Sequence, residues 1–156
     1  MHVVKDGQRE LEFDGDLLST SSSHRPGSAR WVEFSLYRTV GGQYVLSRIG
    51  KSTCYHRADC AVVSRNRIDM QTQDSLDRDA TPCWECTPDA FDDLVAPEQP
   101  RYWAQVSESA SGVVSSLYKY DNDGTRYLTN VAKRLLNDAA RLDGDLRSIF
   151  LRERVQ

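Results

Sequence analysis

Four cysteines and one histidine in the middle of the chain constrain its fold more than any other feature. Cys54 and His56 precede Cys60, and 22 residues further on the chain reads Cys83-Trp84-Glu85-Cys86. A Cys-x-x-Cys pair on a tight turn holds two thiolates within reach of one ion. His56 and Cys60 are four residues apart, which places them on one face of a helical turn. Cysteine and histidine suit zinc, so the spacing predicts one structural zinc ion that ties this region together.

Five candidate ligands compete for the four positions of a tetrahedral site. We favour the set His56, Cys60, Cys83 and Cys86, because the four-residue spacing of His56 and Cys60 is compact. Cys54 is the alternative to His56, and a site that used Cys54 would be all-cysteine. If His56 binds the metal, Cys54 is left as a buried or unused thiol.

The rest of the sequence favours metal binding over disulfide bonds. The chain of 156 residues begins MHVVKDGQRE, without the apolar stretch of a signal peptide. No apolar run approaches the ~20 residues that span a bilayer, so we expect a soluble cytoplasmic protein that binds no membrane. Thiols stay reduced in the cytosol, where clustered cysteines are better explained by metal binding.

The segments before the cysteines have the patterns of β-strands. Alternating polar and apolar residues over 9–22 predict two short strands joined by a tight turn at Asp14-Gly15-Asp16, and the Ser-rich stretch 19–30 is typical of a surface loop. Residues 31–50 alternate around Gly41-Gly42, which predicts a β-hairpin with its turn at the glycine pair. This hairpin leads directly into Cys54 and His56.

The segments after the cysteines are mainly helical in pattern. Thr87 as N-cap and Pro88 predict a helix over 87–95, which Pro97 and Pro100 end. We expect a strand at 101–107 with Tyr102, Ala104 and Val106 on one face, and a short helix at 109–120. Apolar residues then recur at helical spacing, which predicts an amphipathic helix; they are Leu128, Val131, Leu135, Ala139 and Leu142. We expect Gly144 to cap the end of this helix and Asp145 to begin another.

These elements predict a single α+β domain over 1–156. Its parts are a β-rich segment of antiparallel hairpins at 1–50, a zinc-binding module at 51–96 and a mainly helical segment at 101–156. The last two helices could form a helix-turn-helix, but their basic residues are scattered. We therefore expect the C-terminal helices to pack on the sheet.

Residues 50–89 resemble the zinc-binding module of the Ada DNA-repair protein. The shared features are the pair Tyr55-His56, the three-residue gap to Cys60, and the run from Pro82 to Pro88 that contains Cys83 and Cys86. In the Ada family the position of His56 is a cysteine whose zinc-bound thiolate accepts a methyl group from DNA. The resemblance therefore implies a metal site here, while the histidine implies that the methyl transfer is absent.

Charge is unevenly distributed along the chain. Residues 24–67 contain eight basic and two acidic residues, and 69–98 contain nine acidic residues and one basic one. We favour a zinc-stabilised binding or regulatory protein that is not an enzyme and acts through a protein partner. The first alternative is nucleic-acid binding through the basic 24–67 segment with Trp31, Tyr37 and Tyr44. The second is an alkyl-transfer or zinc-dependent enzyme, in which Cys54 or Glu85 would act beside the metal.

No catalytic residue can be assigned from the sequence. Asp121-Asn122-Asp123-Gly124 resembles the start of a calcium loop, but Ala132 occupies the twelfth position, where a glutamate is required. We therefore interpret residues 121–124 as a turn.

Overall fold

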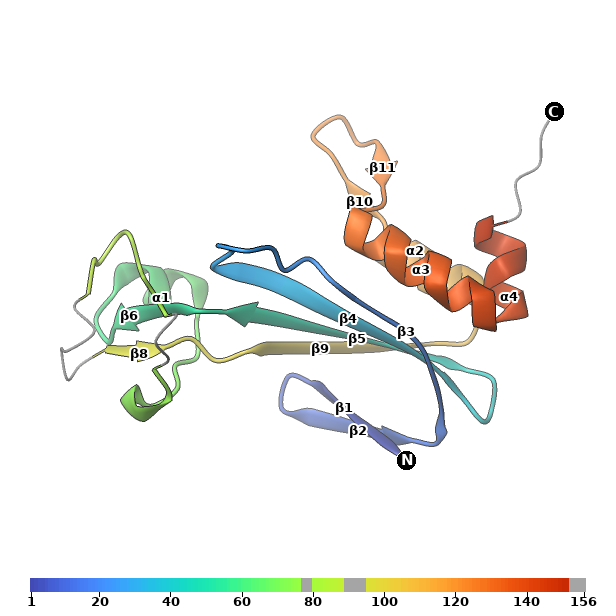
Figure 1. Ribbon diagram of the computed structural model, residues 1–156, viewed down its shortest axis with the longest axis horizontal. Helices are drawn as coiled ribbons and strands as arrows, with labels where there is room; N and C mark the ends of the chain where they lie inside the picture. Colours follow the sequence, from blue (N-terminus) through green and yellow to red (C-terminus); the bar gives the residue numbers. More distant parts are fainter. Residues whose placement is uncertain (77–79, 89–94, 152–156) are drawn as a thin grey trace. The chain divides into compact units, whose positions relative to one another are not determined.

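The computed structural model describes residues 1–76, 80–88 and 95–151 (Figure 1). Antiparallel strands and C-terminal helices are both present, which confirms the α+β class. The chain divides into two compact units. We call Met1–Ser23, Val32–Ile49 and Tyr102–Gln156 the sheet unit, and His24–Trp31 and Gly50–Arg101 the cysteine unit.

A four-stranded sheet runs in the order β3-β4-β5-β9. Its strands are β3 (Gly15–Ser22), β4 (Arg30–Thr39), β5 (Tyr44–Ser52) and β9 (Arg101–Ser107). The β4–β5 hairpin predicted around the glycine pair is confirmed, and of the two glycines Gly42 takes the positive φ, 87°. The strand predicted at 101–107 is also confirmed as β9, although Val106 is exposed.

Helices cover one face of the sheet in the sheet unit, as predicted (Figure 1). They are α2 (Ala110–Leu117) and α3 (Asn130–Leu142), followed by α4 (Gly144–Leu146) and a π-helical turn over Arg147–Leu151. Strand residues with period-two spacing meet the helices in one core, because alternate side chains of a strand share a face. The strand members of that core are Phe34, Leu36, Tyr44 and Leu46.

The loop predicted for 19–30 is wrong in its first part, because β3 continues to Ser22. Ser19 and Ser21 are buried against α3, where the hydroxyl of Ser19 donates to the carbonyl of Leu135 at 2.7 Å and that of Ser21 donates to the carbonyl of Val131 at 2.8 Å. Serine is small enough to let a helix approach a strand closely, and these bonds satisfy the buried hydroxyls.

A second hairpin packs on the other face of the sheet unit. It joins β1 (His2–Asp6) to β2 (Arg9–Phe13) through a turn at Gly7, whose φ is 62°. The two strands predicted within 9–22 are present, but their expected pairing with each other is wrong: β2 pairs with β1, and β3 pairs with β4. The hairpin brings Val4 onto Val45 and Ala104 in a small core of its own.

The C-terminal helices differ in detail from the prediction. Helix α3 begins after Thr129, whose hydroxyl accepts from the Ala132 amide, and it ends at Leu142, with Asp143 as its C-cap. Gly144 is not its cap. It lies inside α4 with no positive φ, and Asp143 caps α4 by accepting from the Leu146 amide at 3.0 Å. Leu142, predicted to lie on the buried stripe, is 70% exposed.

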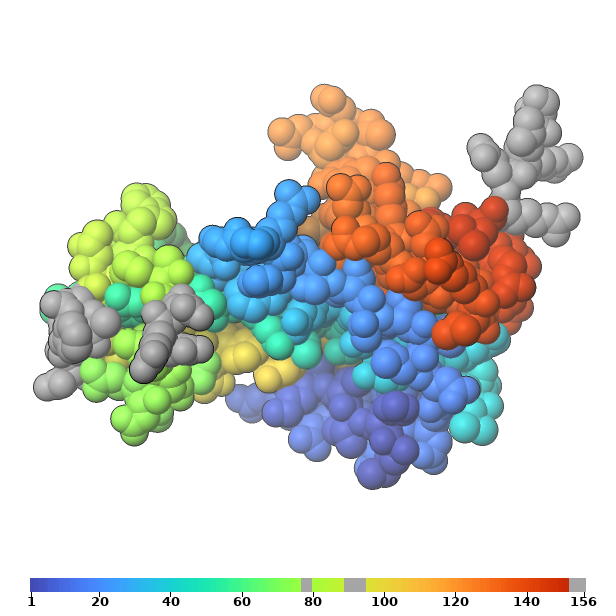
Figure 2. Space-filling view, in the orientation of Figure 1, coloured from blue at the N-terminus to red at the C-terminus, as the bar shows by residue number. Residues whose placement is uncertain are grey.

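Between α2 and α3 the chain forms a small hairpin, which stands out in orange in Figure 2. Its strands are β10 (Lys119–Tyr120) and β11 (Arg126–Tyr127). The predicted turn at 121–124 is confirmed, because the Asp121 carboxylate accepts from the amides of Asp123 and Thr125 at 2.9 Å each. The helix predicted at 109–120 is present as α2, with Ser109 as its N-cap, but it ends at Leu117, and Lys119 and Tyr120 form β10 instead.

The cysteine unit is built around β6 (Cys54–Arg57), the central strand of a sheet in the order β7-β6-β8. Strand β7 (Thr81–Pro82) is parallel to β6, and β8 (Val95–Pro97) is antiparallel to it. Helix α1 (Ala61–Asn66) follows β6, and a 3₁₀ turn, η1, spans Gln73–Ser75.

The helix predicted over 87–95 lies mostly at 89–94, outside the described residues. At its ends the prediction is wrong. Thr87 has a φ of 41°, whereas an N-cap residue is extended, and Val95 begins β8. Within the described parts of the chain, no helix is both long and apolar enough to cross a membrane.

Candidate metal centre

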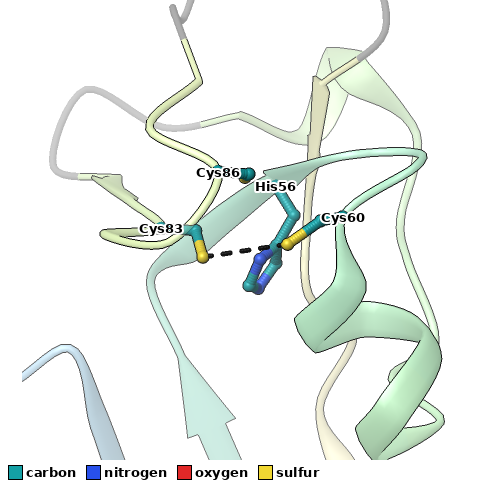
Figure 3. A group of neighbouring side chains, drawn as sticks. All are labelled: His56, Cys60, Cys83 and Cys86. Atoms are coloured by element: carbon teal, nitrogen blue, oxygen red, sulfur yellow. Dashed lines mark hydrogen bonds between the residues drawn. The ribbon is translucent and has the colours of Figure 1, made fainter.

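His56, Cys60, Cys83 and Cys86 come together in the cysteine unit. One ligand atom from each of the four side chains lies within 4.8 Å of all the others. Figure 3 shows the side chains of Cys60 and Cys83 pointing toward each other beside the His56 ring, and their sulfur atoms are 3.9 Å apart. His56 is fully buried, Cys60 and Cys83 are nearly so, and Cys86 is half-buried. This group could hold a metal ion.

Backbone hydrogen bonds of the surrounding elements hold three of the four candidate ligands, His56, Cys60 and Cys83. The helical turn predicted to carry both His56 and Cys60 is wrong: His56 lies inside β6, and Cys60 is an extended residue before the first residue of α1. The amide of Cys60 is bonded to the carbonyl of Arg57 at 3.0 Å. The amide of Cys83 donates to the carbonyl of Tyr55 at 3.0 Å, and the amide of Thr87 closes the turn onto the carbonyl of Cys83 at 2.7 Å. The positive φ of Thr87 belongs to this turn.

The hydrogen bonds of the His56 ring leave one nitrogen for a metal. Its Nε2 atom lies 2.6 Å from Oε1 of Glu98. Its Nδ1 atom is buried and has no hydrogen-bond partner among the described residues. A buried polar atom without a partner is costly, and coordination of an ion would satisfy it. The donor set of one imidazole nitrogen and three thiolates therefore fits a metal ion.

Glu98 and Arg30 belong to this site, and sequence reasoning missed both. The Glu98 side chain is 7% exposed and accepts from His56 and from the Arg30 guanidinium through the same oxygen, Oε1. Glu98 follows β8, and the pairing of β8 with β6 brings it to a residue 42 positions earlier in the chain. No motif spacing encodes that long-range pairing.

The thiols of the Cys-x-x-Cys pair titrate differently. Burial raises the pKa of Cys83, but hydrogen bonds from the backbone of Cys86 and Glu85 and from the thiols of Cys60 and Cys86 lower it more, to about 7. Burial and the contacts with Cys60 and Cys83 together raise the pKa of Cys86 to about 11, although a hydrogen bond from the Arg57 backbone lowers it. Of this pair, Cys83 therefore loses its proton more readily than Cys86.

Cys54, the alternative ligand, is not one of the four clustered residues. It is buried at the start of β6 and lies against the Arg30 guanidinium. Cys54, His56 and Cys83 all line a pocket of about 500 Å³ in the cysteine unit, with Arg65 and Trp84 among its other walls. Trp84, between two of the clustered cysteines, is 84% exposed.

The oppositely charged segments meet in this unit. Arg30 pairs with Glu98, and Arg65 pairs with Glu85 at 3.1 Å, so two arginines of the basic segment contact acids of the acidic one. The aromatic residues considered for nucleic-acid binding also have partners. Trp31 stacks edge-on with His24, Tyr37 packs against Phe13, and the Tyr44 hydroxyl donates to Asp143.

No protein-family model, curated protein or solved structure matches this chain. The resemblance of residues 50–89 to the Ada module therefore rests on the motif residues, and the structure adds the His/Cys₃ cluster itself.

Proposed function

We propose that this chain is a zinc-stabilised binding or regulatory protein, without catalytic activity of its own, that acts through a protein partner. The observation that carries the proposal is the buried His56, which clusters with three thiols and whose Nδ1 has no hydrogen-bond partner within the described part of the chain. One nitrogen and three sulfurs form one of the common ligand sets of structural zinc.

The geometry of the cluster supports zinc. Two thiolates about 2.3 Å from one tetrahedral zinc ion are about 3.8 Å apart. The sulfur atoms of Cys60 and Cys83 are 3.9 Å apart. Four protein ligands fill a tetrahedral shell and leave no open position for water or substrate, which supports a structural role for the ion.

Trp84 supports a role in protein binding. The turn that carries Cys83 and Cys86 presents Trp84 to solvent, with 84% of its surface exposed, beside the 500 Å³ pocket. Exposed tryptophans on a rigid support often anchor protein interfaces. The metal would hold this turn in place, and the turn would present the side chain to a protein partner.

Several basic and aromatic residues named for nucleic-acid binding are engaged within the protein, which makes that alternative less favourable. Arg30, Arg38 and Arg65 are in ion pairs, and the Tyr44 side chain is buried. Nucleic-acid binding would appear as retention on DNA or RNA that weakens steeply with salt. Retention of that kind would favour the alternative over a protein partner.

The enzyme alternative has an equally direct test. Alkyl transfer would add the mass of one methyl group to a cysteine after exposure to methylated DNA. Histidine at position 56 replaces the thiolate that performs this step in the Ada family, so we expect no mass change.

The zinc proposal is tested by native mass spectrometry and metal analysis of the protein purified in a reducing buffer. We expect one zinc ion per chain, lost in Cys83→Ser and retained in Cys54→Ser. The two variants each remove one buried thiol, and only one of those thiols belongs to the cluster. A folded wild-type protein that binds no zinc would refute the proposal, and loss of zinc in Cys54→Ser would move the fourth ligand from His56 to Cys54.

The partner is tested by parallel affinity purification of the wild type and Trp84→Ala from the source cells. We expect a protein that co-purifies with the wild type to be lost from Trp84→Ala, while the zinc content stays at one per chain. Trp103→Ala, which removes an exposed tryptophan of the sheet unit, serves as the control and should retain the partner.

A further inference from the structure

The hydrogen bonds around Glu98 place it behind the candidate ligand His56. A neutral imidazole carries one N–H, and its position decides which nitrogen is free to bind a metal. Glu98 Oε1 is 2.6 Å from Nε2, and a carboxylate accepts hydrogen bonds but does not donate them. Nε2 therefore carries the hydrogen, and Nδ1 keeps its lone pair toward the site.

The backbone fixes Glu98 where it is needed. Its amide donates to the carbonyl of Cys54 at 3.0 Å, and its carbonyl accepts from the Gln71 side chain at 2.9 Å. The residue before it, Pro97, pairs with Tyr55 across the β6–β8 ladder. Glu98 and His56 are thus held by the same pair of strands.

Arg30 compensates the buried charge of Glu98. The carboxylate is 7% exposed, and a buried carboxylate without a partner is strongly unfavourable. The Arg30 guanidinium, itself 53% exposed, donates to the same oxygen as the His56 ring. The chain of contacts therefore runs from the metal ligand, through one buried carboxylate, to an arginine at the surface of the cysteine unit.

We propose that Glu98, held in place by Arg30, is the positioning residue that fixes the His56 tautomer and ring orientation for zinc binding through Nδ1. This inference rests on the proposed zinc site. It assigns to Glu98 and Arg30 a role that no ligand motif contains. Carboxylates that orient a ligating histidine raise metal affinity, and their loss weakens binding about 10- to 100-fold.

The test compares zinc dissociation constants, measured by competition with a chromophoric chelator at neutral pH. We expect Glu98→Ala to bind zinc about 10- to 100-fold more weakly than the wild type. Glu98→Gln, whose amide oxygen still accepts from Nε2, should fall between the two. Glu85→Ala is the matched control, because Glu85 lies between two ligands but contacts Arg65 at the surface. Its loss should change affinity by no more than about fivefold, the limit for an exposed ion pair.

A second readout separates positioning from general stability. In zinc-loaded protein with ¹⁵N-labelled histidine, the NMR spectrum should show His56 protonated at Nε2 and coordinated through Nδ1. Arg30→Met should weaken zinc binding more than Glu85→Ala while preserving that tautomer, because the acceptor is still present.

The outcomes are distinct. Glu98→Ala with the affinity of Glu85→Ala, or zinc-bound His56 protonated at Nδ1, overturns the positioning role and leaves the zinc site standing. If Glu98→Ala does not fold, Glu98→Gln decides: weaker binding than Glu85→Ala supports the role, and equal binding overturns it. A wild-type protein that binds no zinc overturns the zinc site and the positioning role together.

Discussion

Removing the metal should unfold the cysteine unit and leave the sheet unit folded. The perturbation is EDTA added to zinc-loaded protein in a reducing buffer, which extracts the ion without changing the sequence. We expect the two units to respond differently because their buried cores are of different kinds.

The buried residues of the two units give the expected size of the effect. In the cysteine unit, the buried cluster consists of two candidate ligands, Cys60 and Cys83, with Val62 and Ile68. Burial of one valine and one isoleucine contributes about 3–6 kcal/mol together. Tyr55 and Val95 are also buried in this unit, but its apolar core is small, so metal binding should supply a large share of its stability. The main core of the sheet unit has fifteen buried residues, and none of them is a cysteine.

Hydrogen exchange followed by mass spectrometry measures both units in one experiment. With free zinc about 1,000 times above its dissociation constant, the bound ion contributes about 4 kcal/mol, and its removal should speed exchange about 1,000-fold. The affected amides should include those of Cys83 and Glu98, which bond to β6. Amides of α3, such as that of Lys133, should keep their protection. Unchanged protection around β6 after verified zinc removal would refute the reasoning.

Three further predictions concern the sheet unit. Tyr44→Phe removes a buried hydrogen bond of 2.6 Å to Asp143 and should lower the free energy of unfolding, measured in urea, by about 1.5–3 kcal/mol. The control, Tyr120→Phe at an exposed site, should change that free energy by less than about 0.5 kcal/mol. Burial raises the pKa of Asp143, but hydrogen bonds from Tyr44, the Leu146 amide and Arg38 lower it more, so the pKa lies below its ordinary 3.8. The contribution of the Asp143 carboxylate to the stability of the fold is therefore present above about pH 4 and is lost as the pH falls through the lowered pKa. Asp143→Asn should therefore be less stable than the wild type at pH 7, and a deficit that stays constant down to pH 2 would contradict this. Leu135→Ala should lower the free energy of unfolding by about 2–5 kcal/mol, because the Leu135 side chain is fully buried. Leu142→Ala on the same helix should lower it by less than about 0.5 kcal/mol, because Leu142 is exposed. Equal losses of stability for the two variants in thermal unfolding would contradict the burial pattern.

Local patterns in the sequence predicted the elements that local forces determine. The hairpin around Gly42, helix α2 with its Ser109 cap and helix α3 each depend on residues close together in the chain, and each is present. The pairing of β2 with β1 depends on His2–Asp6, a strand that lies outside the 9–22 segment for which a hairpin was predicted. Ser19 and Ser21 are polar enough to suggest a loop, and only the approach of α3 makes a strand favourable there.

The candidate site was predictable to the extent that its ligands carry a spacing. Cys83 and Cys86 form a local pair on one turn. His56 and Cys60 are also close in the sequence, but a strand and the turn after it bring them together, not the predicted helical turn. What spacing cannot provide is the environment of the histidine. Glu98 reaches His56 only because β8 pairs with β6, and Arg30 reaches Glu98 from a segment that lies before both strands in the sequence.

A histidine ligand places a demand on the fold that a cysteine ligand does not. A thiolate coordinates through its only donor atom, whereas an imidazole has a second nitrogen that needs a hydrogen-bond acceptor when buried. At position 56 that acceptor is Glu98, whose buried charge in turn needs Arg30. Relative to an all-cysteine site, a histidine at one ligand position thus brings in two further charged residues. The Glu98–Arg30 pair is then a consequence of having histidine at this candidate ligand position.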